Sequence, residues 1–179
     1  MPEKTGQRPH SAADTPLGSF DDVEAIVRLE PRDQKRELRL WLRLLTCANL
    51  IESEIRQRLR IDYDMTLPRF DLMAQLYREP DGLRLSDLSK RMMVSNGNLT
   101  ALVDRLIADG YVSRTTDTND RRAAVVQLTK AGTLIFSQLA EAHEGWLRAL
   151  MGDLSPVQIQ SLTQDLAQLK RSLIHRRQD

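Results

Sequence analysis

Residues 85–128 read LSDLSKRMMVSNGNLTALVDRLIADGYVSRTTDTNDRRAAVVQL, and this stretch decides the fold. Ser86 and Asp87 favour the start of a short helix, because their side-chain oxygens can accept hydrogen bonds from amides that the first turn leaves free. Ser95 favours the start of a second helix in the same way, and Gly110 favours its end. The stretch therefore opens with two helices separated by a few residues.

The second half of this stretch changes from helix to extended chain. Residues 111–115 and 123–128 contain the β-branched residues that favour strands. Residues 116–122 between them hold aspartate and asparagine, which favour turns. We therefore predict a β-hairpin with a polar tip that carries Arg121 and Arg122.

A further helix is predicted just before the stretch. Pro68 suits a first helical turn, where no N–H donor is needed, and Pro80 with Gly82 favours the end of this helix. Three short helices followed by a two-stranded hairpin are the arrangement of a winged helix-turn-helix, in which the hairpin forms the wing.

The helix predicted between Ser95 and Gly110 has two unlike faces. At 100° per residue, its leucines and Val103 gather on one side and predict burial, whereas the opposite side carries small or polar residues. A face with so little bulk can approach the floor of a DNA major groove, where an asparagine amide can pair with adenine. The DNA contacts predicted for this helix and the strand after it are Ser95, Asn96, Gly97, Asn98, Thr100, Ala101, Arg105 and Arg114.

The wing tip offers a different kind of contact. An arginine at a hairpin tip can enter the narrow, negative minor groove, and Asp120 would hold the guanidinium of Arg121 in one orientation. We therefore predict that Asp120, Arg121 and Arg122 take part in DNA binding. Residues 84–128 carry seven Lys and Arg residues against five aspartates, a net charge of only +2. Since phosphate contacts dominate affinity, a single copy should bind DNA weakly and two copies better.

Long helical patterns on both sides of this region supply a frame for such a pair. Residues 35–60 and 130–177 carry apolar stripes wider than one domain's interior needs, and Thr129 and Ser155 favour helix starts in the second of these segments. In the last helix leucines alternate in steps of four and three, as in paired helices. The predicted dimer interface comprises Leu38, Leu42, Leu45, Trp146, Leu162, Leu166, Leu169 and Leu173.

The predicted fold is mainly α, a winged helix-turn-helix of six main helices and a two-stranded β-wing that dimerises through its N- and C-terminal helices. Residues 66–128 form the DNA-binding lobe, and residues 35–60 with 130–177 form the dimerisation region. Residues 1–30 carry six acidic and three basic residues and little apolar surface. They therefore predict an acidic, largely disordered arm with a possible short helix at 19–29.

Composition excludes several other classes of protein. The chain has 179 residues, 41% of them hydrophobic and 28% charged. Residues 92–103 form the longest uncharged run, which is shorter than the ~18 residues that a membrane span needs. One cysteine and three histidines leave no internal disulfide and little for a metal site. We expect a cytoplasmic protein without metal or cofactor.

Several motifs, in order and at matching spacing, resemble the MarR family of bacterial transcriptional regulators. The resemblance covers roughly residues 35–175. The motifs are LSDLSKR at 85–91, VSNGNLT at 94–100, LVDRL at 102–106, DGYV at 109–112, Arg114, the wing segment DRR at 120–122, and Val126, Leu128, Thr129 and Gly132.

The resemblance implies a ligand-responsive regulator, most often a repressor, that binds a palindromic operator as an obligate homodimer. Its recognition helices would enter successive major grooves, with Ser95, Asn96, Asn98 and Thr100 facing bases and phosphates. A small aromatic effector, such as an aromatic carboxylate or a phenol, would bind in a pocket between the dimer helices and the DNA-binding lobe. Its binding would release the regulator from the operator. The candidate lining residues are Trp41, Tyr63, Arg69, Phe70 and His143.

Three other functions are weighed against this one. Cys47 could make the protein a peroxide-sensing regulator, but its apolar mid-helix neighbours favour a buried structural thiol, although Arg43 lies four residues before it. A dimeric adaptor that has kept the fold and lost DNA binding is a second alternative. An enzyme is the third, and we expect none, because the histidines stand in no spacing typical of a nucleophile and its base.

Overall fold

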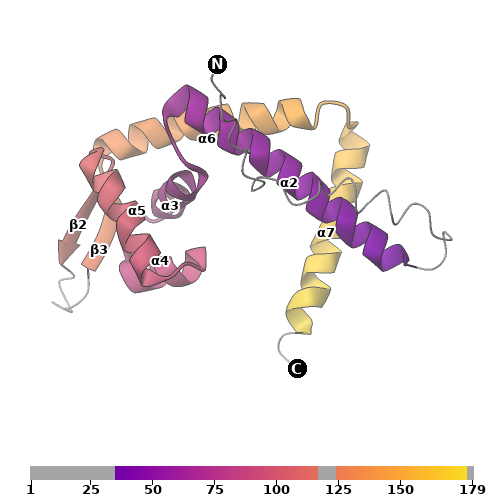
Figure 1. Cartoon of the computed structure of the whole chain (residues 1–179), viewed down its shortest axis with the longest axis horizontal. Coiled ribbons are helices and arrows are strands. Elements are labelled where there is room, and N and C mark those ends of the chain that lie inside the picture. The colour runs from indigo at the N-terminus through magenta and orange to yellow at the C-terminus, as the bar shows by residue number, and fades with distance from the viewer. Residues whose placement is uncertain (1–34, 117–123, 177–179) are drawn as a thin grey trace, which may run out of the picture. The chain divides into compact units, whose positions relative to one another are not determined.

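The computed structural model describes residues 35–116 and 124–176, which Figure 1 draws in colour. The acidic arm, with its possible helix, and the wing-tip residues Asp120, Arg121 and Arg122 lie outside the described residues. The chain divides into two compact units, Met1–Glu52 and Ser53–Asp179. The described part of the first unit is the beginning of a long helix, α2.

Helices make up most of the described chain and confirm the predicted mainly helical fold. Six helices occur among the described residues: α2 (Arg36–Tyr63), α3 (Leu67–Tyr77), α4 (Leu85–Met92), α5 (Asn96–Ala108), α6 (Lys130–Leu150) and α7 (Pro156–His175). The strands are β1 (Leu83–Arg84), β2 (Val112–Thr116) and β3 (Ala124–Leu128).

The sheet has one strand more than the predicted hairpin. β2 and β3 pair antiparallel with Val112 opposite Leu128, and β1 joins the other edge of β3 with Leu83 opposite Val126. Gly82 allows this approach, because its φ is +87° and a Cβ there would lie 2.7 Å from the carbonyl oxygen of Val126. A strand of two residues is too short to be recognised from alternation of apolar and polar residues.

Hydroxyl caps begin three of the helices, as predicted. Ser95, Thr129 and Ser155 accept hydrogen bonds from backbone amides at the starts of α5, α6 and α7. α4 differs, because it begins at Leu85 rather than at Ser86 and has no side-chain cap. β1 leads directly into α4, so the pairing of β1 with β3 holds the backbone before the first turn.

Thr129 closes the base of the hairpin. Its hydroxyl donates to the carbonyl oxygen of Gly110 at 2.8 Å and accepts from the N–H of Gly132 at 3.0 Å. Its own N–H donates to the carbonyl oxygen of Tyr111 at 3.0 Å. The end of α5, the base of the hairpin and the first turn of α6 therefore meet at one residue.

The core of the second unit forms around α3, which packs against α4, α5, α6 and β3. The most deeply buried large side chains are Leu59, Met65, Leu72, Met73, Leu76, Leu88, Leu99, Val103, Leu106, Val126 and Leu139. Among the described helices, none combines the length and the apolar character that crossing a membrane requires.

Gly132 brings the first turn of α6 against the backbone before β2. A Cβ at this position would lie 1.9 Å from the carbonyl oxygen of Tyr111. We expect Gly132→Ala to lower the free energy of unfolding by about 1–3 kcal/mol, because a backbone atom cannot turn aside to relieve the overpacking. Chemical denaturation measures this loss.

Gly145 provides the matched control on the same helix. Apart from its chain neighbours and the nearby backbone of α6, no heavy atom of the described chain lies within 4 Å of a Cβ at Gly145. Gly145→Ala should leave stability unchanged or raise it by up to about 1 kcal/mol, because alanine favours a helix interior. Equal unfolding midpoints for Gly132→Ala and Gly145→Ala would contradict the close packing of Gly132 against the backbone of Tyr111.

Candidate nucleic-acid interface

α5 presents the two faces that its periodicity predicts. Leu99, Val103 and Leu106 are at most 1 % exposed, and Leu102 is half-buried. The opposite side is exposed to solvent and consists of Ser95, Asn96, Gly97, Asn98, Thr100, Ala101, Asp104 and Arg105. Apart from its chain neighbours and the nearby backbone of α5, no heavy atom of the described chain lies within 4 Å of a Cβ at Gly97, so the beginning of the helix is open.

Local hydrogen bonds hold the backbone at this end of α5. The hydroxyl of Ser95 accepts from the N–H of Asn98 at 3.3 Å, and the hydroxyl of Thr100 donates to the carbonyl oxygen of Asn96 at 2.9 Å. The side-chain amide of Asn98 makes no hydrogen bond within the described part of the chain. It can therefore offer both a donor and an acceptor to a base edge.

Arg114 has a partner within the lobe. Its guanidinium forms an ion pair with Asp104 at 3.2 Å, and its side chain is 33 % exposed. Since Arg114 lies on β2 and Asp104 on α5, this ion pair links the hairpin to the helix, although its exposure to water keeps its contribution small. The sequence did not reveal it, because ten residues and a change from helix to strand separate the two side chains.

The turn between α4 and α5 is held by side-chain and backbone contacts. The hydroxyl of Ser89 donates to the carbonyl oxygen of Val94 at 2.8 Å, and Met93 ends α4 in the left-handed conformation with a φ of 53°. Arg91 of α4 forms an ion pair with Glu79 at 2.8 Å, just after α3. The first two features shape the turn from α4 to α5, and the ion pair links α4 to the end of α3.

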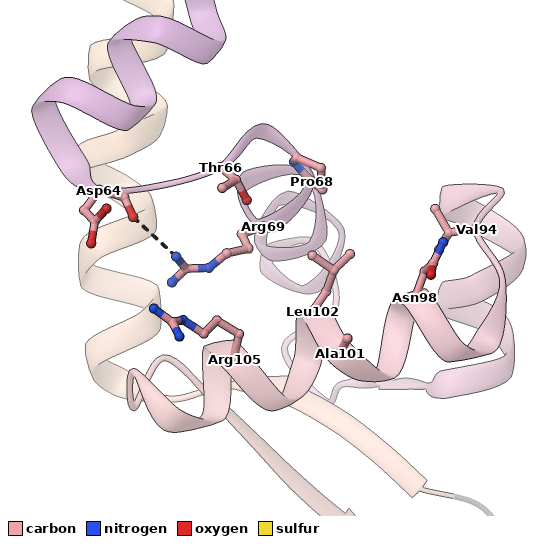
Figure 2. Close-up of a pocket in the computed structure, with 9 residues that line it drawn as sticks. All are labelled: Asp64, Thr66, Pro68, Arg69, Val94, Asn98, Ala101, Leu102 and Arg105. Carbon is pink, nitrogen blue, oxygen red and sulfur yellow. Dashed lines mark hydrogen bonds between the residues drawn. The ribbon is translucent and has the colours of Figure 1, made fainter. Parts of the chain in front are cut away.

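A pocket of about 670 Å³ lies between the beginning of α3 and the exposed side of α5 (Figure 2). Its lining residues are Asp64, Thr66, Pro68, Arg69, Val94, Asn98, Ala101, Leu102 and Arg105. In Figure 2 the guanidinium groups of Arg69 and Arg105 lie at the same end of the pocket, and Asn98 lies at the other. Arg105 makes no ion pair with the described residues, whereas Arg69 pairs with Asp109.

Three of the five effector-pocket candidates come together in an aromatic cluster. The Phe70 and His143 rings have centroids 5.1 Å apart. The Trp146 ring lies near both His143 and Tyr63, with its centroid 6.5 Å from that of His143 and 6.1 Å from that of Tyr63. Partial burial lowers the pKa of His143, and the nearby charge of Asp71 opposes this shift.

The other two effector-pocket candidates, Arg69 and Trp41, take no part in these ring contacts. Arg69 lines the pocket beside α5 and bonds to Asp109 and to the carbonyl oxygen of Asp64. Trp41 is exposed on the part of α2 that belongs to the first unit.

The residues predicted for a dimer interface differ in how much of each is exposed. Leu42 is buried, and Leu45, Trp146 and Leu169 are half-buried. The remaining residues are exposed, and they are Leu38, Leu162, Leu166 and Leu173. No described residue of α7 is buried, and a groove of about 570 Å³ runs along its last turns.

Cys47 is exposed rather than buried, so the interpretation of a buried thiol is wrong for the described chain. The apolar residues on either side of Cys47 in α2 do not show whether other parts of the chain cover this position. Among the described residues, His, Cys, Asp and Glu side chains form no group of three that could hold a metal ion.

Comparisons with known proteins agree with this geometry. The sequence profile described as the MarR family matches residues 65–124. The HTH-type transcriptional regulator YfiV from Bacillus subtilis is 33% identical over 134 residues, which are 75% of this chain and 81% of that protein. The transcriptional activatory protein BadR from Rhodopseudomonas palustris is 32% identical over 128 residues, 69% of this chain and 73% of that protein.

Solved structures have the same fold. A MarR family transcriptional regulator from Silicibacter pomeroyi superimposes with a TM-score of 0.67 at 34% identity, over 80% of this chain and 99% of that one. FabT from Streptococcus pneumoniae has a TM-score of 0.67 at 23% identity, over 78% of this chain and 98% of that one, and shows the likeness in fold alone. The relatives in these comparisons are named as transcriptional regulators, a class distinct from enzymes. The chain therefore belongs to the MarR family and is a DNA-binding transcriptional regulator.

Proposed function

We propose that this regulator binds a palindromic operator as a homodimer and represses transcription. Two copies of α5 would enter successive major grooves, and the wing residues Arg121 and Arg122 would enter the flanking minor grooves, with Asp120 orienting Arg121. The observation that carries the proposal is the exposed face of α5, which is small, polar and open at Gly97. FabT of Streptococcus pneumoniae and MepR of Staphylococcus aureus, which share the fold, were both solved with DNA.

The exposed leucines of α7 support the dimer. Leu162, Leu166 and Leu173 lie 40–60 % exposed on one helix that has no buried residue in the described chain. Apolar side chains at this spacing are stabilised when a second helix covers them. Doubling the chain also doubles the positive charge that meets the phosphates, which one DNA-binding lobe supplies only weakly.

Repression needs only that the bound dimer covers a promoter. The names of relatives include both directions of regulation, since BadR is named an activatory protein and YetL of Bacillus subtilis a repressor. We place the protein in the cytoplasm, where bacterial DNA lies. We propose an aromatic carboxylate or a phenol as the effector, and the aromatic cluster of Tyr63, Phe70 and His143 supplies ring surfaces of matching chemistry.

The proposal is tested by measuring binding to the duplex upstream of the protein's own gene. We expect the affinity to fall at least ~100-fold between 50 and 200 mM salt, because bound phosphates release counterions. Asn98→Ala should cost about 1–3 kcal/mol on this duplex and little on unrelated DNA, whereas Arg121→Ala should weaken binding to both. An affinity independent of salt and of both substitutions would favour the adaptor instead.

A further inference from the structure

Arg69, on the first turn of α3, joins two other elements of the lobe. Its residue surface is only 9 % exposed. One terminal nitrogen, Nη1, donates to the carbonyl oxygen of Asp64 at 3.3 Å, and the other, Nη2, forms an ion pair with a carboxylate oxygen of Asp109. Figure 2 shows the guanidinium turned toward Asp64, on the side of the pocket away from Val94. We call these two contacts the Arg69 bridge.

The first contact lies where α2 ends. Asp64 follows the last residue of α2 and has a φ of 49°, and its N–H donates to the carbonyl oxygen of Arg60 at 3.2 Å. The N–H of Met65 donates to the carbonyl oxygen of Leu59 at 3.0 Å. These bonds are typical of a helix C-terminus, where the last carbonyl groups lack partners and attract a cation. Arg69 therefore binds the end of α2.

The second contact lies where α5 ends. Asp109 is the C-cap residue of α5, and its N–H donates to the carbonyl oxygen of Arg105 at 3.0 Å. Gly110 follows with a φ of +77° and turns the chain toward β2. The Asp109 side chain is 28 % exposed and that of Arg69 11 %, so water screens the pair less than it would at the surface. Arg69 therefore fixes the end of α5 relative to the end of α2.

We propose that Arg69 is a positioning residue, which sets the direction of α5 relative to α2 and thereby the distance between the two recognition helices of a dimer. This inference rests on the proposed binding of an operator by a dimer. An arginine suits the task, because its planar fork directs two donors to two fixed acceptors, which an ammonium group cannot do. The partly buried ion pair adds orientation more than stability, since removing its charges from water offsets much of their attraction.

A small rotation of α5 about its C-terminal end would produce a large displacement at its N-terminal end. Asn98 lies eleven residues before Asp109, which is about 16 Å along α5 at 1.5 Å per residue. A rotation of 5° at the anchored end would therefore move Asn98 by about 1.4 Å, more than the roughly 0.5 Å range over which a hydrogen bond stays strong. DNA contacts at the beginning of α5 thus depend on a contact at its end.

The experiment uses an operator that the wild-type protein selects from a random duplex library. Its half-sites are then moved one base pair closer or farther apart, which also rotates them by about 35°. We expect the wild type to lose at least ~10-fold in affinity at either wrong spacing. In Arg69→Gln and Asp109→Asn the loss of affinity at the wrong spacing should shrink to about 2–3-fold. In Arg69→Lys this loss should be intermediate between those two variants and the wild type.

Phe136→Leu is the control for a general loss of stability. Phe136 is 5 % exposed on α6, its ring lies 5.5 Å from that of Phe70, and it is not part of the Arg69 bridge. This variant should unfold at a lower temperature and keep the wild-type spacing preference. If Arg69→Gln also keeps it, or if Phe136→Leu loses it equally, Arg69 has a merely structural role and the proposal is wrong.

Amide hydrogen exchange tests the bridge without DNA. In Arg69→Gln and Asp109→Asn we expect faster exchange at Gly110 and Tyr111, after α5, and in Arg69→Gln also at Met65, after α2, because the two ends are no longer held together. Unchanged exchange at all three amides would overturn the bridge. If the wild type selects no duplex with paired half-sites, the proposed operator binding fails, and the exchange result still decides whether Arg69 holds the two helices.

Discussion

Ala101→Glu is expected to reduce operator affinity by about 100- to 1,000-fold while the protein stays folded. Ala101 is exposed in the middle of α5, and glutamate is a good helix former, so the lobe should tolerate the change. In the major groove, however, the longer side chain would hold the helix away from the bases and bring a carboxylate near the phosphates. Fluorescence anisotropy on a labelled operator measures the loss, and circular dichroism checks the fold.

The control is Gln138→Glu, which adds the same charge at an exposed position of α6. It should change the affinity less than about 3-fold, since a single charge away from the groove is largely screened by salt. A similar loss in both variants would mean that net charge, and not the face of α5, controls DNA binding.

Leu166→Asp is expected to convert the protein to a monomer at micromolar concentration. Leu166 is 46 % exposed in the single chain, and its apolar neighbours on α7 line the groove of about 570 Å³. A carboxylate buried between two such helices would lose its hydration without gaining a partner, so the dimer dissociation constant should rise at least ~100-fold. Sedimentation equilibrium measures the constant, and operator affinity should fall with it.

Gln164→Asp supplies the comparison, because Gln164 is also exposed but lies on the opposite side of α7. We expect this variant to remain a dimer with nearly normal affinity. If Leu166→Asp sediments like the wild type, α7 does not form the interface, and the exposed leucines need another explanation.

The features that the sequence predicted are those that depend on neighbouring residues. The two faces of α5 follow from a period of 3.6 residues, and the starts of α5, α6 and α7 follow from single hydroxyl residues. The hairpin was predictable because β-branched segments flank a polar turn. Each of these signals lies within about ten residues of the structure that it determines.

The features that the sequence did not predict depend on residues far apart in the chain. The ion pair of Arg69 joins it to Asp109, forty residues away, so the sequence around either residue does not indicate it. β1 is held by β3, and that pairing moves the start of α4 to Leu85. Cys47 was misjudged because a helical stripe indicates which side is apolar and not how much of it the chain covers.

Thr129 has a consequence for how any signal can reach the DNA. Three of its hydrogen bonds join the chain just after α5, the base of the hairpin and the first turn of α6. A displacement of the first turn of α6 would therefore act on the end of α5 and on the base of the hairpin through the same residue. If the proposed effector acts through α6, it would therefore shift α5 and the hairpin together rather than either of them alone.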